Sequence, residues 1–205
     1  MSMSMEIEHV ISQLINLCIE SDDPDPLTRE GKEVPVIQDM FREFGVSEKV
    51  LFMLQSRFVP EGTKEMKDIA MDPFLLRCCH LGYRLTRAVA QNHLVNGIAF
   101  SMRIGFMMTQ LGNGFHVADA LVAIFRNNRT LLEKVNQEHV EAFINLLRAK
   151  GKVPRYLEFL ACTLACVPAY GAKLNELGEK TPVGMRPNQR MVGQQLLRNQ
   201  DILYN

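Results

Sequence analysis

The sequence has no excess of charge of either sign. Lys and Arg together number 23, as do Asp and Glu, so the formal net charge at pH 7 is zero. A chain without net charge produces no overall field that attracts nucleic acid or an anionic membrane surface. We therefore expect no nucleic-acid partner, and any anion that binds must be held by a local cluster of basic side chains.

The chain also lacks a long apolar run. Its most apolar segment, residues 98–111, is too short to span a bilayer and contains Arg103. The first 19 residues carry Glu6 and Glu8 where a secretory signal has basic residues. We expect no membrane insertion of this segment, and a cytosol-type environment.

Cysteine pairs and catalytic motifs are missing as well. An odd number of cysteines without a paired framework is typical of buried thiols in a reducing compartment. Cys162 and Cys166 lie one helical turn apart, but no C-x-x-C motif or nearby His completes a metal site, so the metal reading is the weaker alternative. The cysteines are Cys18, Cys78, Cys79, Cys162 and Cys166.

No local signature of an enzyme is present either: no G-x-S-x-G, H-E-x-x-H, P-loop or dinucleotide-binding glycine pattern. The histidines fall on different predicted helices, which favours surface or helix-end positions over a catalytic base. We therefore predict that the chain is not an enzyme and needs no cofactor. The histidines are His9, His80, His93, His116 and His139.

Apolar residues recur at spacings of three and four almost throughout, which predicts helices, and runs that alternate in the manner of strands are absent. Short connections between the helices favour antiparallel pairs, so the expected fold is all-α: an armadillo-like helical solenoid forming a single domain, residues 1–205. The predicted helices cover 5–19, a segment from Pro35 to Phe44, a segment after Ser47, 72–90, 92–111, 116–126, 136–150, 154–167 and 188–198.

Two segments interrupt this pattern. Residues 1–34 read as an N-terminal helix followed by an acidic, proline-rich turn, and residues 170–187, with three glycines and two prolines, read as a mobile loop. Gly45 is expected to end one helix in a left-handed conformation and Ser47 to cap the next. The predicted core contains Leu121, Phe125, Leu131, Phe143, Leu147, Leu157, Leu160 and Leu164.

Two side-chain stripes allow a functional interpretation. Arg77, Arg84 and Arg87 share one side of the helix 72–90, where they form either a phosphate-binding stripe or, more simply, a solvated polar face. Met102, Met107 and Met108, with nearby aromatic residues, form either an adaptable partner surface or a core helix, and the core is the simpler reading.

Three segments resemble a known family: 83–87 (YRLTR), 104–107 (IGFM) and, most specifically, 127–134 (NNRTLLEK). In this order and spacing they are similar to the RIH helical domain of inositol trisphosphate receptors. Residues 138–147 and 188–197 are also similar to the equivalent domain of ryanodine receptors. The resemblance covers roughly residues 35–201, whereas 1–34 and 170–187 are weakly matched or extra.

The resemblance implies an armadillo-like domain near the N-terminus of an intracellular calcium-release channel. Such a domain lies on the cytosolic face of the endoplasmic reticulum or a similar store. Its expected partners are the other domains of the parent channel, namely a β-trefoil and further helical domains. In inositol trisphosphate receptors the trefoil supplies the other half of the ligand cleft.

The family's ligand site carries over only in part. In those receptors a basic helix before the glycine corner and a Tyr-Arg-Lys triplet grip the phosphates. Here only Arg42 matches the basic helix, and the triplet positions hold His93-Leu94-Val95. With Arg84 and Arg87 from the arginine stripe, these residues form at most a degenerate phosphate site, since each missing charge-assisted contact costs about 1.5–3 kcal/mol.

The sequence therefore favours a non-catalytic module that couples neighbouring channel domains to gating. One alternative is a degenerate module that binds inositol phosphate weakly. Another is a free-standing α-solenoid that serves as a scaffold for protein–protein interaction.

Overall fold

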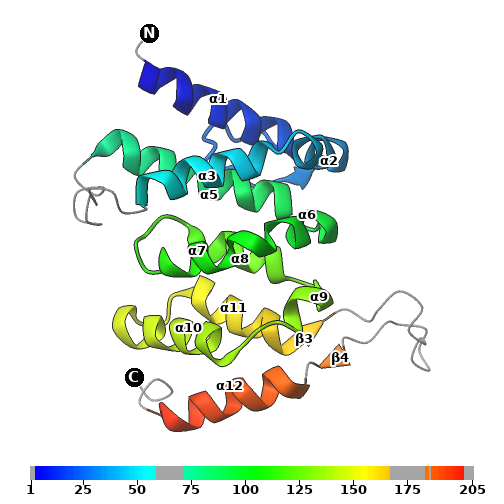
Figure 1. The fold of residues 1–205 in the computed structure, drawn as a ribbon, viewed down its shortest axis with the longest axis vertical. Coiled ribbons are helices and arrows are strands. Elements are labelled where there is room, and N and C mark those ends of the chain that lie inside the picture. The colour runs from blue at the N-terminus through cyan, green and yellow to red at the C-terminus, as the bar shows by residue number, and fades with distance from the viewer. Residues whose placement is uncertain (1–2, 59–71, 167–182, 185, 201–205) are drawn as a thin grey trace. The chain divides into compact units, whose positions relative to one another are not determined.

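The computed structural model describes residues 3–58, 72–166, 183–184 and 186–200. These residues are mostly helical, which confirms the all-α prediction (Figure 1). The chain forms two compact units, Met1–Ala123 and Ile124–Asn205, whose boundary falls within one helix. The predicted single domain and the solenoid arrangement stay predictions.

The first unit is built around one long central helix, α5, which packs against α1, α2, α3 and α6 (Figure 1). Its helices are α1 (Met3–Cys18), α2 (Pro35–Glu43), α3 (Val46–Phe58), α5 (Pro73–Ala90), α6 (Leu94–Ala99) and α7 (Ile104–Thr109), with the 3₁₀ helix η1 (Phe100–Arg103) and the start of α8 (Val117–Phe125).

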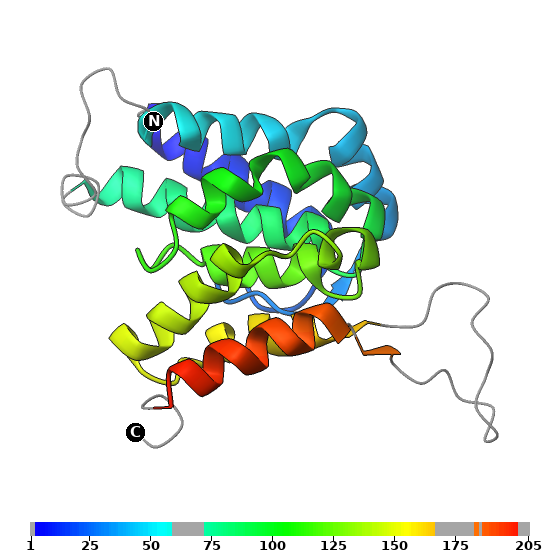
Figure 2. The ribbon, with the colours of Figure 1, turned by 60° about the horizontal axis from the view of Figure 1, so that its bottom comes forward.

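The second unit contains α10, α11 and α12, which pack against one another (Figure 2). Its other described elements are the end of α8, a short helix and a pair of short strands. The bounds are α9 (Arg129–Leu132), α10 (Gln137–Lys150), α11 (Pro154–Leu164), α12 (Arg186–Arg198), β3 (Ala165–Cys166) and β4 (Val183–Gly184).

Helix α5 begins where the sequence predicted. The Asp72 side chain accepts a hydrogen bond from the Leu75 N–H, and Pro73 occupies the first turn, where its missing N–H costs nothing. Helices cover more than one side of α5, so the predicted solvated polar face is wrong for Arg84, which is only 4% exposed. Periodicity identified the helix but not how many neighbours surround it.

The corner between α2 and α3 is partly as predicted. Gly45 has φ of +61°, the left-handed conformation that glycine adopts without strain. Ser47, however, lies inside the first turn of α3, and its buried hydroxyl has no hydrogen-bond partner, so its predicted capping role is wrong. Apolar spacing predicts an inward face of Ile37, Met40, Phe41 and Phe44 on this helix. Phe41 is buried, but Met40 and Phe44 are exposed, because α2 turns Gln38 and Phe41 inward.

The predicted helix 92–111 is divided. It consists of α6, η1 and α7, with the tighter η1 turn in the middle. Within it Phe100 and Met107 are buried, as the core reading requires, whereas Met102 is 88% exposed. The stripe of methionines therefore belongs only partly to the core.

Aromatic stacking organises the core of the second unit. The rings of Phe143 and Phe159 stack with centroids 3.8 Å apart, and Phe125 meets Phe159 edge-on at 5.6 Å. Six of the eight predicted core residues are buried, but Leu157 is 45% exposed and Leu164 is half-buried. Helix α11 turns Tyr156, Phe159, Leu160 and Thr163 inward, and Leu157 lies to one side of that stripe.

The segment 1–34 contains a strand pair that the sequence did not predict. The N-terminal helix ends at Cys18, and β1 (Ile19–Glu20) pairs antiparallel with β2 (Lys32–Glu33) around the acidic turn. Two-residue strands are too short to show an alternating pattern, so this pair left no signal in the sequence. β3 and β4 form a second antiparallel pair.

Other predictions concern the loop, the membrane and the thiols. The predicted mobile loop 170–187 lies largely outside the described residues, and its described part includes β4. In the described part of the chain no helix has the length and apolarity needed to cross a bilayer. Cys18, Cys78 and Cys79 are buried, whereas Cys162 is only half-buried. Burial raises the pKa of the Cys18 thiol to about 12. The side chain of Cys166 is outside the described part.

Gly31 should be required at the turn between β1 and β2. A Cβ at this position would lie 2.0 Å from the backbone oxygen of Glu20, so the backbone would have to move. We expect Gly31→Ala to lower the free energy of unfolding by about 1–3 kcal/mol, measured by urea denaturation. Gly193→Ala is the matched control: its Cβ meets nothing within 4 Å, and alanine in α12 should add up to about 1 kcal/mol. Equal effects of the two substitutions would contradict the close approach.

Candidate functional site

The predicted site residues Arg42 and His93 lie side by side, joined through Asp39. The Arg42 Nη1 is 2.5 Å from Asp39 Oδ1, and the His93 Nε2 is 3.2 Å from the same oxygen. The hydrogen bond from Arg42 lowers the pKa of Asp39, and electrostatic interactions with His93 and Arg42 add to this effect. Together they outweigh desolvation and hold the pKa below its usual range. The two groups expected to bind phosphate are thus already bound to a carboxylate of α2.

His93 has a structural task in addition. It caps α6, where its Nδ1 accepts a hydrogen bond from the Asn96 N–H at 3.3 Å. An Nδ1 that accepts leaves the proton of the neutral ring on Nε2, which faces Asp39. Both ring nitrogens are therefore engaged, and His93 is a poor candidate for an additional phosphate contact.

Two buried carboxamides position this cluster. The Gln38 Nε2 donates to the carbonyls of Ala88 and Gln91, at 2.8 and 2.9 Å, and the Asn96 Nδ2 donates to the carbonyls of Val89 and Gln38, both at 2.9 Å. The last carbonyls of a helix lack intrahelical partners, so Gln38 and Asn96 satisfy the C-terminal end of α5.

The same network reaches Arg42. Its Nη1 donates to Asn96 Oδ1 at 2.9 Å, while Nη2 is 3.7 Å from Glu43. Arg42 therefore completes the hydrogen bonding of a buried amide and contacts two carboxylates. The sequence predicted the helix before Gly45 and its single arginine, Arg42. It did not show the partners of Arg42, which lie on α6 and on α2 itself.

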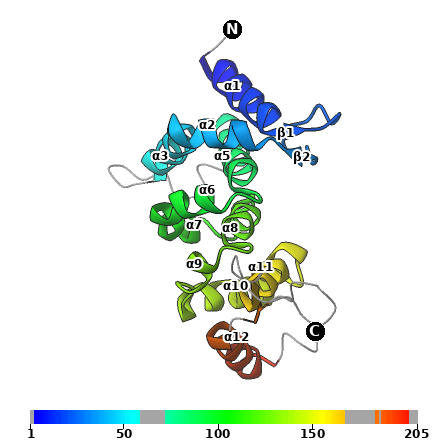
Figure 3. The same ribbon diagram turned by 90° about the vertical axis from the view of Figure 1, so that its right-hand side faces the viewer.

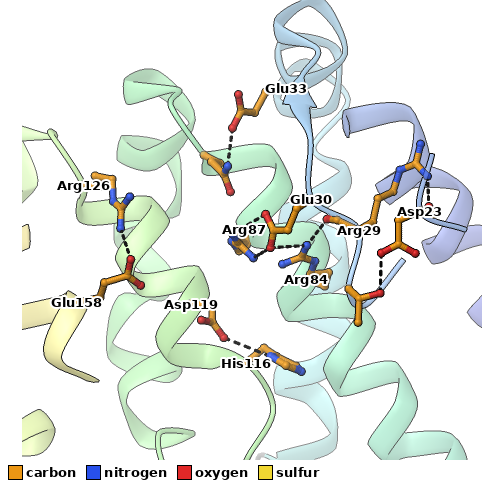
Figure 4. A network of polar contacts seen from close by, with 12 residues as sticks. Asp23, Arg29, Glu30, Glu33, Arg84, Arg87, His116, Asp119, Arg126 and Glu158 are labelled. Atoms are coloured by element: carbon orange, nitrogen blue, oxygen red, sulfur yellow. Dashed lines mark hydrogen bonds and ion pairs between the residues drawn. The ribbon is translucent and has the colours of Figure 1, made fainter. Parts of the chain in front are cut away.

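Arg84 and Arg87 form a second cluster, around Glu30. Arg87 makes a bidentate contact, with Nη1 2.6 Å from Oε1 and Nη2 2.9 Å from Oε2, and the Arg84 Nη2 is 3.0 Å from Oε1 (Figure 4). Arg84 also donates to the carbonyl of Arg29. Glu30 belongs to the segment between β1 and β2, so these arginines fasten that segment to α5.

The charge of Glu30 is stabilised by this arrangement. Partial burial alone would raise its pKa, but the hydrogen bonds and positive charges of Arg87 and Arg84 outweigh burial, and the pKa is lowered. Within the described residues, no hydrogen bond or ion pair joins this cluster to that of Arg42 and His93. The predicted four-residue site is therefore two separate pairs of basic side chains, each in contact with its own carboxylate.

A small pocket lies at the glycine corner, beside Arg42. Its lining includes Arg42, Gly45, Ser47 and Asn96. The buried Ser47 hydroxyl at this pocket has no hydrogen-bond partner. Nothing in the sequence pattern indicated this pocket.

A third group of titratable side chains joins α5 to the start of α8. The rings of His80 and His116 meet edge-on, with centroids 5.3 Å apart, and Phe115 lies 6.0 Å from His80. The His116 Nδ1 is 3.2 Å from Asp119 Oδ2. Burial, with the nearby His116 and Arg77, lowers the pKa of His80. Most histidines lie at helix ends as predicted, but His80 is half-buried within α5.

No metal site emerges from these groups. Among the described residues no cluster of three or more His, Cys, Asp or Glu side chains could hold a metal ion. The described arrangement therefore consists of helix-capping amides and internal ion pairs.

Residues 7–205 match the family model of the RIH domain. The chain belongs to this family. It is 27% identical over 165 residues to inositol 1,4,5-trisphosphate receptor-like protein A of Dictyostelium discoideum, covering 78% of this chain and 5% of that protein. It is 28% identical over 151 residues to inositol 1,4,5-trisphosphate receptor itr-1 of Caenorhabditis elegans, covering 68% of this chain and 5% of that receptor. The resemblance inferred from sequence is confirmed, and the chain spans a small part of these relatives.

The neutral His80 should make stability depend on pH. A folded-state pKa below the unfolded value means that the unfolded RIH domain binds more protons between the two values. The free energy of unfolding should therefore fall as the pH drops below about 6.5, the ordinary pKa of histidine. Chemical denaturation at several pH values tests this effect.

His80→Gln should reduce that fall, whereas His9→Gln, which removes an exposed imidazole of α1, should leave it unchanged. Burial also lowers the pKa of His139, so part of the slope should remain in the His80 variant. If the free energy of unfolding of His80→Gln fell with pH as steeply as that of the unmodified chain, the proposed contribution of His80 would be contradicted.

Proposed function

We propose that this RIH domain is a non-catalytic module of an intracellular calcium-release channel and couples neighbouring cytosolic domains to gating. Family membership over residues 7–205 and the receptor names of its relatives support this assignment. On this proposal the domain lies on the cytosolic face of an endoplasmic-reticulum-type membrane. Its partners are a β-trefoil and further helical domains of the parent channel.

The observation that carries the proposal is the internal pairing of the basic side chains expected to bind ligand. Arg42 and His93 contact Asp39, and Arg84 and Arg87 contact Glu30. An incoming phosphate would have to compete with these carboxylates and would meet their negative charge. A site whose basic side chains already contact carboxylates favours a structural role over ligand capture.

The packing of the first unit supports transmission of movement. Gln38 and Asn96 join α2 and α6 to the end of α5, while Glu30 fastens the segment before α2 to the middle of α5. Breaking any of these contacts would leave a buried polar group unsatisfied, which costs about 1–3 kcal/mol. We infer that a force applied to α2 or α6 is passed to α5 because the three helices move together.

Two other functions remain alternatives. A degenerate inositol-phosphate module would use Arg42 and His93 after displacing Asp39. These two residues lie next to each other, whereas Arg84 is buried, so a phosphate site at Arg42 and His93 is favoured over one at Arg84. A free-standing scaffold would use the same helical packing in a protein that is not a channel.

The parent protein distinguishes a channel module from a scaffold. An antibody raised against this chain should recover, from detergent-solubilised intracellular membranes, a protein many times longer than 205 residues. Reconstituted into vesicles, that protein should conduct calcium ions. Recovery of a short protein from the soluble fraction alone would favour the scaffold and contradict the proposal.

Inositol trisphosphate should bind the isolated domain undetectably, or only at very high concentration. Isothermal titration calorimetry near physiological ionic strength, where the Debye length is about 8 Å, measures this directly. Asp39→Asn releases Arg42 and His93 from their shared partner, so it should produce weak binding at low salt that fades as salt is added.

Asp22→Asn is the matched control, because it removes an exposed carboxylate and the same unit of charge. It should not create binding. Micromolar binding that selects among inositol isomers and is lost in Arg42→Ala would contradict the proposed role of the cluster and favour the ligand-binding alternative.

A further inference from the structure

The first unit exposes apolar side chains on two neighbouring helical segments. Their exposed fractions range from 41% to 88%, on a unit whose core contains fully buried leucines. Single exposed apolar residues are ordinary, but a contiguous set marks an interaction surface. The set, here called the α2–α6 face, consists of Val36, Met40 and Phe44 on α2, Leu94, Val95 and Ile98 on α6, and Met102 on η1.

Both stripes turn away from α5, on helices that pack against each other. Val36, Met40 and Phe44 are spaced by four residues, which places them along one side of α2. On the opposite side of that helix Gln38 reaches the end of α5, and Asn96 does the same from α6. Because both inward residues point to α5, both apolar stripes turn away from it, and α2 lies beside α6 (Figure 3).

Acidic groups lie between the stripes. Asp39 precedes Met40 in α2 and touches His93, which precedes Leu94, so its carboxylate stands where the two stripes meet. Arg42 and His93 both contact Asp39 through Oδ1, so Oδ2 can accept further hydrogen bonds. Glu43 is 69% exposed and reaches Arg42 only at 3.7 Å. The α2–α6 face thus combines apolar contact area with carboxylate oxygens that can accept further hydrogen bonds.

We propose that the α2–α6 face binds an amphipathic helix whose apolar stripe carries Lys or Arg along one edge. The apolar side chains supply contact area, and the carboxylates of Asp39 and Glu43 select a basic partner over an acidic one. This inference rests on the proposed function, in which the RIH domain meets other segments of its parent protein. On this inference, the α2–α6 face is the surface through which such a basic segment binds.

Model peptides test the charge preference. The probes are two fluorescent 18-residue helices, one of Leu and Lys and one of Leu and Glu, with the same apolar stripe. Fluorescence anisotropy with the intact 205-residue chain should show saturable binding of the Leu/Lys peptide and at least tenfold weaker binding of the Leu/Glu peptide. Glu43→Lys should reduce or reverse that preference.

Substitutions that keep the charge test the apolar contact. Met40→Gln combined with Val95→Gln should weaken binding of the Leu/Lys peptide at least fivefold, with an unchanged circular dichroism spectrum because both side chains are exposed. Val10→Gln, an equally exposed apolar position on α1, is the matched control and should bind like the unmodified chain.

Three results would overturn the inference. They are equal binding of the two peptides, equal weakening by the α1 control, and a dimer in sedimentation analysis that the Met40 and Val95 substitutions dissociate. The last would assign the face to a second copy of the chain. Recovery of a channel-sized parent, combined with any of these results, would leave the proposed function standing and remove only this surface.

Discussion

The hydrogen bonding of the C-terminal end of α5 is the constraint on which the first unit depends. This end is enclosed by α2 and α6, so its last carbonyls must find protein partners. Gln38 and Asn96 provide them, and Asn96 in turn accepts from Arg42. One buried polar network therefore fixes the orientation of two helices and the position of the arginine.

The second unit meets the same need with a similar device. The Asn188 Nδ2 donates at 3.0 Å to the carbonyls of Leu132 and Thr163, near the ends of α9 and α11, and Gln189 reaches the carbonyl of Leu164. A carboxamide suits this task because one NH₂ group can serve two carbonyls. In both units, amides from one helix satisfy the ends of others and set how the helices pack.

This network includes the residues that the family resemblance suggested as a degenerate phosphate site. His93 is used to cap α6 and to contact Asp39, while Arg42 serves Asn96 and two carboxylates. Arg84 and Arg87 are used to hold Glu30. The residues that would have to release these contacts to bind a phosphate are those that maintain the packing around α5, which connects the loss of ligand chemistry with the proposed role in coupling.

Local rules in the sequence determined the all-α fold, the start of α5 at Asp72–Pro73, the left-handed Gly45 and most of the second unit's core, since periodicity and caps act within a few residues. The resemblance to the family was also visible locally, most specifically in the run NNRTLLEK. Only tertiary structure decided that Arg84 is buried against Glu30, that Met40 and Phe44 face outward, and that Arg42 and His93 share Asp39. Glu30 and Arg84 are 54 residues apart in the chain, so their pairing depends on long-range packing, which no short sequence pattern records.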